Sequence, residues 1–305
     1  MQKLIFILLI STIIQINGRV IQAQESLLPD DQESSFFQAV RANQKESYIT
    51  FGGGVGNIEP LIFEGLVAPY FLLRTSGDAK WGATLSPVIY IRMYNEYSFP
   101  VRTPSYMPQI TFYRMIGDEN KRSLNYLFLN LVHHSNGQDD DFFNEDGSIN
   151  TLSGDFSTDF LEVGAFFTQQ LVPFSNTREY FKTSIEYHPD ITRAKDLEGR
   201  YSFLRWNNSF RVFRFFGSAE SLKFEKTPRI QSTLKTTWMF GDINDSGFFD
   251  IGERFNISFT IAYRPRVLSD VSFFANFYSG KDYYNMQFDR RLTVFRFGLQ
   301  AFAFR

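Results

Sequence analysis

The chain has 305 residues, no cysteine and a formal net charge of −2, with 31 lysines and arginines against 33 aspartates and glutamates. The lack of cysteine excludes a disulfide scaffold, a thiolate zinc site and a cysteine nucleophile. A nearly neutral chain without a basic run is not expected to bind nucleic acid. Aromatic residues make up 18% of the chain, which argues against disorder.

The N-terminus has the pattern of a secretory signal peptide. Lys3 precedes an apolar run over residues 4–16, which is shorter than the ~20 residues of a membrane-spanning helix. We expect cleavage after Ala23, which leaves 282 residues (305 − 23). The alternative is a buried or membrane-anchoring N-terminal helix. Residues 24–46 are expected to form a polar periplasmic lead-in to the first domain.

Several later segments alternate apolar and polar residues with a period of two. They are residues 125–135, 158–167, 256–263 and 271–277. This alternation is typical of β-strands with one apolar face. None of the later apolar runs approaches the ~20 residues that a membrane helix needs.

A soluble β-sandwich and a transmembrane barrel both fit this alternation. The export signal, the aromatic residues near strand ends and the mean hydropathy of −0.22 favour the barrel, which combines an apolar belt with a polar interior. The aromatic-rich terminal segment, residues 291–304, fits a closing strand. Twelve strands leave about 23 residues for each strand and its connection, which suits membrane strands of ~9–11 residues. We therefore predict an all-β fold, a transmembrane antiparallel β-barrel of 12 strands, over residues 47–305.

The most informative motif is LVHHSNG, at residues 131–137. On a strand, His133 and Ser135 share one face, and three leucines at 127, 129 and 131 precede them on that face. In a barrel this apolar face points to lipid. An imidazole beside a hydroxyl can form a base–nucleophile pair, and the backbone N–H of Gly137 is suitably placed for an oxyanion. The alternative is an ordinary polar strand end at the membrane interface.

A third group is needed to orient the imidazole. Asp159 is in phase with the apolar face of the next strand. Neighbouring strands lie about 4.8 Å apart, so Asp159 can contact His133. The alternative is a carboxylate at the rim of the barrel without a catalytic role.

These residues resemble a known family. The motif LVHHSNG, followed by a polar loop and the strand start STDFLEV, is similar to the active-site region of the outer membrane phospholipase A family. Further blocks resemble that family in the same order, at residues 99–109, 188–201 and 278–298. The resemblance implies a 12-stranded outer-membrane barrel that hydrolyses phospholipids.

The resemblance also implies roles for single residues. Ser135 is similar in position to the nucleophile and His133 to the general base. Asn136 corresponds to the residue that shapes the turn, and Gly137 to the oxyanion donor. Asp159 stands where the family has an asparagine, and the tryptophan and arginine that flank that asparagine are missing here. Aspartate is the commoner orienting residue in triads.

The family is calcium-dependent and works as a homodimer. By position, the resemblance implies calcium ligands at Ser98, Asp155 and the backbone carbonyl of Gln138. The acidic loop over residues 139–150 adds Asp139 as a weaker candidate. The alternative for this loop is a solvated acidic turn.

A second acidic loop covers residues 242–253. Its spacing matches an EF-hand-type calcium loop, with candidate ligands Asp242, Asn244, Ser246, Asp250 and Glu253. The flanking residues have the pattern of strands, so a plain hairpin loop is the alternative. His188, beside a proline in another loop, is expected to be structural.

Together these features predict an outer-membrane phospholipase that cleaves sn-1 and sn-2 acyl esters to fatty acid and lysophospholipid. Its substrates would be membrane phospholipids, its cofactor Ca²⁺ and its active form a homodimer. Two alternatives remain. One is a lipid A deacylase, which also uses a His-x-Ser-Asn strand, and the other is a catalytically silent barrel or pore.

Overall fold

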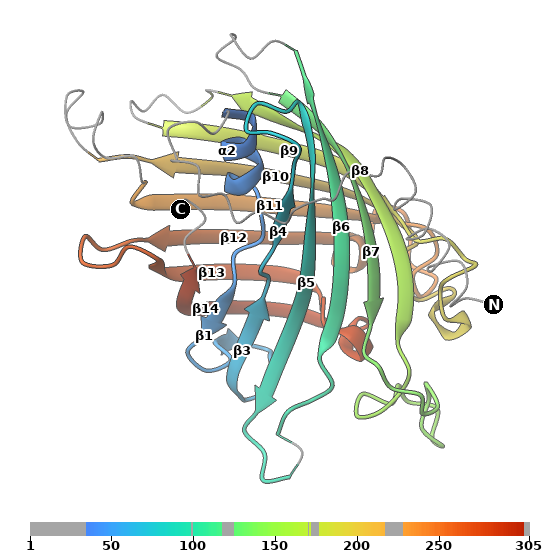
Figure 1. Cartoon of the computed structure of the whole chain (residues 1–305). Coiled ribbons are helices and arrows are strands. Elements are labelled where there is room, and N and C mark those ends of the chain that lie inside the picture. Colours follow the sequence, from blue (N-terminus) through green and yellow to red (C-terminus); the bar gives the residue numbers. More distant parts are fainter. Residues whose placement is uncertain are drawn as a thin grey trace. The chain divides into compact units, whose positions relative to one another are not determined.

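A computed structural model describes residues 35–98, 100–117, 125–169, 171, 177–216 and 228–301. Within these residues twelve antiparallel strands close into a barrel, because β1 pairs with both β3 and β14. Figure 1 shows the strands curving around one interior. This confirms the predicted fold class and strand number. The predicted signal peptide lies outside the described residues.

The twelve barrel strands follow one another around the ring in chain order. They are β1 (Tyr48–Thr50), β3 (Leu61–Val67), β5 (Trp81–Tyr94), β6 (Ser105–Ile116), β7 (Asn125–Ser135), β8 (Ser157–Gln169), β9 (Thr177–Tyr187), β10 (Leu204–Arg214), β11 (Ile230–Phe240), β12 (Phe255–Tyr263), β13 (Val271–Lys281) and β14 (Arg291–Ala301). Two short strands, β2 (Val55–Gly56) and β4 (Phe71–Leu73), pair with β14 and β5.

The described helices are short. They are α2 (Ser35–Ala42), α3 (Ile251–Arg254) and the 3₁₀ turns η2 (Lys195–Leu197) and η4 (Asn285–Gln287). In the part of the chain that the structure describes, we find no helix with the length and apolar character needed to cross a membrane.

The strands alternate between an outward apolar face and an inward polar or aromatic face. On β7 the leucines at 127, 129 and 131 are exposed, whereas Phe128, Asn130 and Val132 are buried. The same alternation holds on β13, where Phe273 and Phe277 point outward. A period of two places successive side chains on opposite faces of a strand. The predicted alternation is therefore confirmed in these segments.

Helix α2 lies inside the barrel, within the segment predicted as a polar lead-in. Its Phe36 and Phe37 are fully buried, and Figure 1 shows the helix within the ring of strands. We call the surrounding residues the helix cluster: Phe36, Phe37, Ala39, Val40, Ala42, Tyr113, Met115, Tyr126, Phe128, Phe166, Tyr180, Phe213 and Phe215. The barrel fixes the end of the helix, because the Arg211 guanidinium donates to the Ala42 carbonyl and pairs with Glu46 at 2.9 Å.

A second aromatic group closes the opposite end of the strands. We call it the loop cluster: Phe142, Phe156, Leu197, Tyr201, Met286 and Phe288. Its members come from the connections β7–β8, β9–β10 and β13–β14. In outer-membrane barrels the longer connections lie on the extracellular side. The two clusters therefore lie at opposite ends of the interior.

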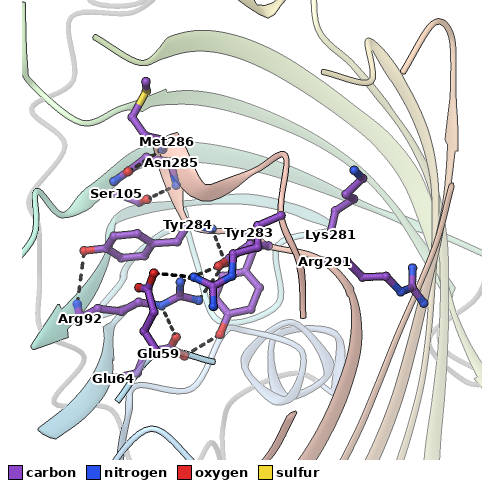
Figure 2. A network of polar contacts seen from close by, with 12 residues as sticks. Glu59, Glu64, Arg92, Ser105, Lys281, Tyr283, Tyr284, Asn285, Met286 and Arg291 are labelled. Carbon is purple, nitrogen blue, oxygen red and sulfur yellow. Dashed lines mark hydrogen bonds and ion pairs between the residues drawn. The ribbon is translucent and has the colours of Figure 1, made fainter. Parts of the chain in front are cut away.

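A buried charge network ties the β13–β14 connection to the barrel wall (Figure 2). The Arg92 guanidinium donates a hydrogen bond of 2.8 Å to Glu64 and two hydrogen bonds, of 2.7 and 2.8 Å, to the carboxylate of Asp282. Arg296 pairs with Glu64 at 2.6 Å, and Tyr283 donates to the same carboxylate. Glu64 and Arg92 are almost fully buried. Such charges are tolerated only because each is paired and hydrogen-bonded.

We expect the Arg92→Met variant to lose about 3–5 kcal/mol of unfolding free energy, because it leaves the buried Asp282 without its ion-pair partner and removes one of the two cations that pair with Glu64. Urea unfolding followed by tryptophan fluorescence measures this loss. Arg290→Met is the matched control, since Arg290 pairs with Glu59 where both side chains are partly exposed, at 31% and 43%. The control should change by no more than about 1 kcal/mol. Equal losses in both variants would show that the network does not stabilise the barrel.

Candidate active site

His133 and Ser135 lie at the end of β7, on its outward face. They continue the line of exposed leucines that begins at Leu127. Neither side chain points into the barrel, because the inward position between them belongs to His134, which is buried against Phe156. The predicted orientation of both residues is thus the observed one.

His133 forms a short hydrogen bond to Asp159 on the neighbouring strand. The two residues face each other in the β7–β8 register, and His133 Nδ1 lies 2.6 Å from Asp159 Oδ1. An ionised carboxylate can only accept, so Nδ1 carries the proton. Both side chains are about two-fifths exposed, at 39% and 43%. The pair therefore fixes the imidazole and leaves Nε2 free of hydrogen bonds from the described residues.

Ser135 is on the same face as His133, two residues further along β7. A two-residue step along a strand spans about 7 Å between Cα atoms, so the side chains are neighbours. The Ser135 hydroxyl has no hydrogen-bond partner among the described residues, and it does not bond to His133 in this conformation. Ser135 sits opposite Tyr106 and Ser157. The structure thus joins His133 to Asp159 and leaves the hydroxyl beside them unbound.

Asn136 shapes the turn that follows. Its side chain is buried, donates to the Gly154 carbonyl at 2.8 Å and accepts from the backbone N–H groups of Phe156 (3.0 Å) and Gln138 (3.3 Å). Gly137 then adopts a φ of 70°, which favours glycine. No acceptor among the described residues takes its N–H, so an exposed donor remains next to Ser135.

We expect Asn136→Ala to loosen the start of β8, because it leaves two backbone N–H groups and one carbonyl without partners, at a cost of about 1–3 kcal/mol. Hydrogen–deuterium exchange of peptides covering residues 154–158 measures this and should become faster. Asn144→Ala, in the same connection but bonded to Ser148, is the control. Unchanged exchange in Asn136→Ala would contradict this role.

The calcium candidates are only partly brought together. Partial burial, together with the charges of Asp196 and Asp139, raises the pKa of Asp155. Gln138 follows directly on the turn and donates its N–H to Asn136. Ser98 lies in an exposed turn after β5, and no contact joins it to Asp155. Asp196 lies within residues 188–201 and was not predicted as a site residue.

Metal-binding geometry is incomplete within one chain. Among the described residues, no group of three or more histidine, aspartate or glutamate side chains is placed to hold a metal ion. Carboxylate and carbonyl oxygens are nevertheless the donors that calcium prefers. The repulsion that raises the pKa of Asp155 is the kind that a bound cation relieves. The donors fit calcium in chemistry, and one chain supplies only part of a shell.

The loop over residues 242–253 is a hairpin connection between β11 and β12, flanked by strands. Asp250 caps α3 by accepting from the Glu253 N–H, and Glu253 pairs with Lys281. Asn244 bonds Asp289. The buried Arg254 donates to four carbonyls of the hairpin. Several of the candidate ligands are thus already engaged within the protein.

His188 is buried and bonded at both ring nitrogens. Nδ1 lies 3.0 Å from Thr158 Oγ1, and Nε2 lies 2.8 Å from Glu186 Oε1. Burial lowers its pKa and the bond to Glu186 opposes this shift. The buried imidazole thus links Thr158 on β8 to Glu186 on β9, in agreement with the structural role predicted for it.

The chain matches no model of a known protein family, and no curated protein matches it. The chemistry available to the site thus follows from its own residues. They comprise an oriented imidazole, a neighbouring hydroxyl and a free backbone N–H on an apolar outer surface. These are the components of nucleophilic acyl transfer.

Proposed function

We propose that this protein is an outer-membrane phospholipase that hydrolyses acyl esters of membrane phospholipids through Ser135, His133 and Asp159. The observation that carries the proposal is the 2.6 Å bond between His133 and Asp159 on the outward face, with Ser135 beside it. The pair stands next to the exposed leucines of β7 on the outward face. A triad built there would meet lipid directly.

The proposed reaction begins when His133 Nε2 takes the proton of the Ser135 hydroxyl. Ser135 Oγ then attacks the acyl carbonyl, and Asp159 stabilises the imidazolium. The Gly137 N–H stabilises the oxyanion. His133 returns the proton to the departing lysophospholipid oxygen, and water hydrolyses the acyl-enzyme by the same steps. The products are a fatty acid and a lysophospholipid.

The position of the site supports a lipid substrate. The two strands that carry the site, β7 and β8, are 11 and 13 residues long. Strands of this length can cross a bilayer at a tilt. His133 and Ser135 lie at the end of that span, where phospholipid esters meet water. Both ends of the interior hold aromatic clusters, which supports an external site over an open pore.

Calcium and a second copy of the chain complete the proposal. Asp155 and the Gln138 carbonyl would hold the ion next to Gly137, and Ser98 would contribute from the other copy. The ion would add positive charge near the oxyanion. A calcium coordination shell shared between two copies is consistent with the few donor groups that one chain brings together. It would also make activity depend on dimerisation.

Fatty-acid release by the refolded, detergent-solubilised protein tests the triad. Ser135→Ala should lower the rate by at least about 10³-fold, and Asp159→Ala by about 10²–10⁴-fold. Asp159→Asn should keep more activity than Asp159→Ala, because its amide oxygen still accepts from Nδ1–H. Ser232→Ala, on the outward face of β11, is the control and should be unaffected. Wild-type protein that releases fatty acid from neither phospholipid nor lipid A would support a silent barrel.

A calcium titration of the same activity tests the metal site. A chelator should abolish hydrolysis, and Asp155→Asn should raise the half-activating calcium concentration by at least about tenfold. Because the pKa of Asp155 is raised, protons should compete with calcium at a higher pH than for an ordinary aspartate. More calcium should therefore be needed as the pH falls. Asp146→Asn is the control, and an identical shift in it would contradict a site at Asp155.

A further inference from the structure

A cavity of about 340 Å³ lies inside the barrel. Residues of the helix cluster and of the loop cluster both line it, so it occupies the space between them. Its volume is in the range of small-molecule sites, which hold about 300–1,000 Å³. The proposed lipase reaction on the outer surface makes no use of this interior space.

Seven cationic side chains line this cavity, and four of them are paired with carboxylates. The pairs are Lys182 with Glu162 at 2.6 Å, Arg205 with Glu186 at 3.1 Å, Arg211 with Glu46 at 2.9 Å, and Lys281 with Glu253. The side chains of the other three, Lys45, Arg200 and Lys235, form no ion pair or hydrogen bond with any described residue, and Arg200 lies over the ring of Phe143. The lining therefore carries an excess of positive charge.

Lys45 and Lys235 lie near the paired cations. Lys235 is at the middle of β11, on the inward face of Gln231 and Thr233, and its side chain is exposed within the barrel. The charges of Arg211, Lys45 and Lys182 repel it, and that of Glu46 attracts it. Lys45 follows helix α2, whose end Arg211 fixes.

Unpaired hydrogen-bonding atoms also line the cavity. His134 is 4% exposed, and its Nε2 has no partner in the described part of the chain. The Nε of Arg205 is likewise buried without a partner. Both residues belong to the cavity lining. Buried polar atoms without partners are rare in proteins, and a bound water, ion or small molecule can supply the missing hydrogen bond.

We propose that this cavity binds a small dianion, of the phosphate or dicarboxylate class, between Lys45 and Lys235. Two negative charges offset those of Lys45 and Lys235, and anionic oxygens accept from lysine and from Arg205. His134 donates through Nε2 in one tautomer. A volume of about 340 Å³ admits a free small anion and is too small for a diacyl lipid. The bound anion stabilises the barrel by removing the repulsion in its interior.

Urea unfolding with inorganic phosphate tests this site. The full-length protein is refolded in detergent at each phosphate concentration, so that the anion has access to the interior. Sodium chloride of matched ionic strength is the reference. The urea midpoint should rise with phosphate and follow RT ln(1 + [L]/Kd) for a single site. A second series uses succinate, a dicarboxylate, in place of phosphate. A rise of the urea midpoint with either anion supports binding of a small dianion.

Lys235→Gln and Lys45→Gln are the test variants, and the exposed Lys80→Gln is the matched control with the same change in charge. Each test variant should unfold in chloride at a midpoint no lower than wild type, since repulsion is removed. Each should bind phosphate at least tenfold more weakly. Lys80→Gln should keep the wild-type response. A response that is the same in all variants would be a general salt effect and would overturn the proposal, as would no difference from chloride.

Discussion

The site depends on the register between β7 and β8. Antiparallel pairing sets His133 opposite Asp159 and Ser135 opposite Ser157. A slip by one residue would turn every side chain of one strand to the other face. The leucines of β7 and Val163 on β8 resist such a slip, because it would bury apolar groups in the polar interior and expose Thr158 and Glu162 outside. The apolar pattern of the wall thus fixes the geometry of the polar pair.

A chain of buried contacts supports the loop end of these strands. The Arg92 network anchors the β13–β14 connection through Asp282, and Asn285 donates to the Thr103 carbonyl and accepts the Met286 N–H. Met286 packs so closely on Gly154 that a Cβ there would lie 2.7 Å from its methyl group. Gly154 in turn accepts from Asn136. The turn beside Ser135 is therefore supported by residues far away in the sequence.

Much of the wall was predictable from the sequence, because strand faces follow from alternation alone. The predicted strand over residues 125–135 has the observed bounds of β7, and the contact of His133 with Asp159 follows from two adjacent strands in phase. Helix α2 was not predicted, since a helix of eight residues is too short to be stable by itself and depends on packing against the barrel aromatics.

Interactions between distant segments could not be predicted. Arg92 and Asp282 are separated by 190 residues, and no local sequence pattern predicts that they pair. The unpaired Lys45 and Lys235 look like ordinary surface lysines in the sequence, and only closure of the barrel places them together. Asp196 approaches Asp155 because the β9–β10 connection folds over the rim. The calcium ligands and the dimer remain predictions for the same reason, since the proposed calcium shell would need a second copy of the chain.

Covalent labelling of the refolded protein by an alkyl fluorophosphonate tests the central claim most directly. The reagent forms an Oγ–phosphorus bond with an activated serine and releases fluoride, and mass spectrometry locates the adduct. We expect one adduct, on Ser135, which is absent in Ser135→Ala and much slower to form in His133→Ala. An unlabelled wild-type protein, or an adduct on another serine, would contradict it.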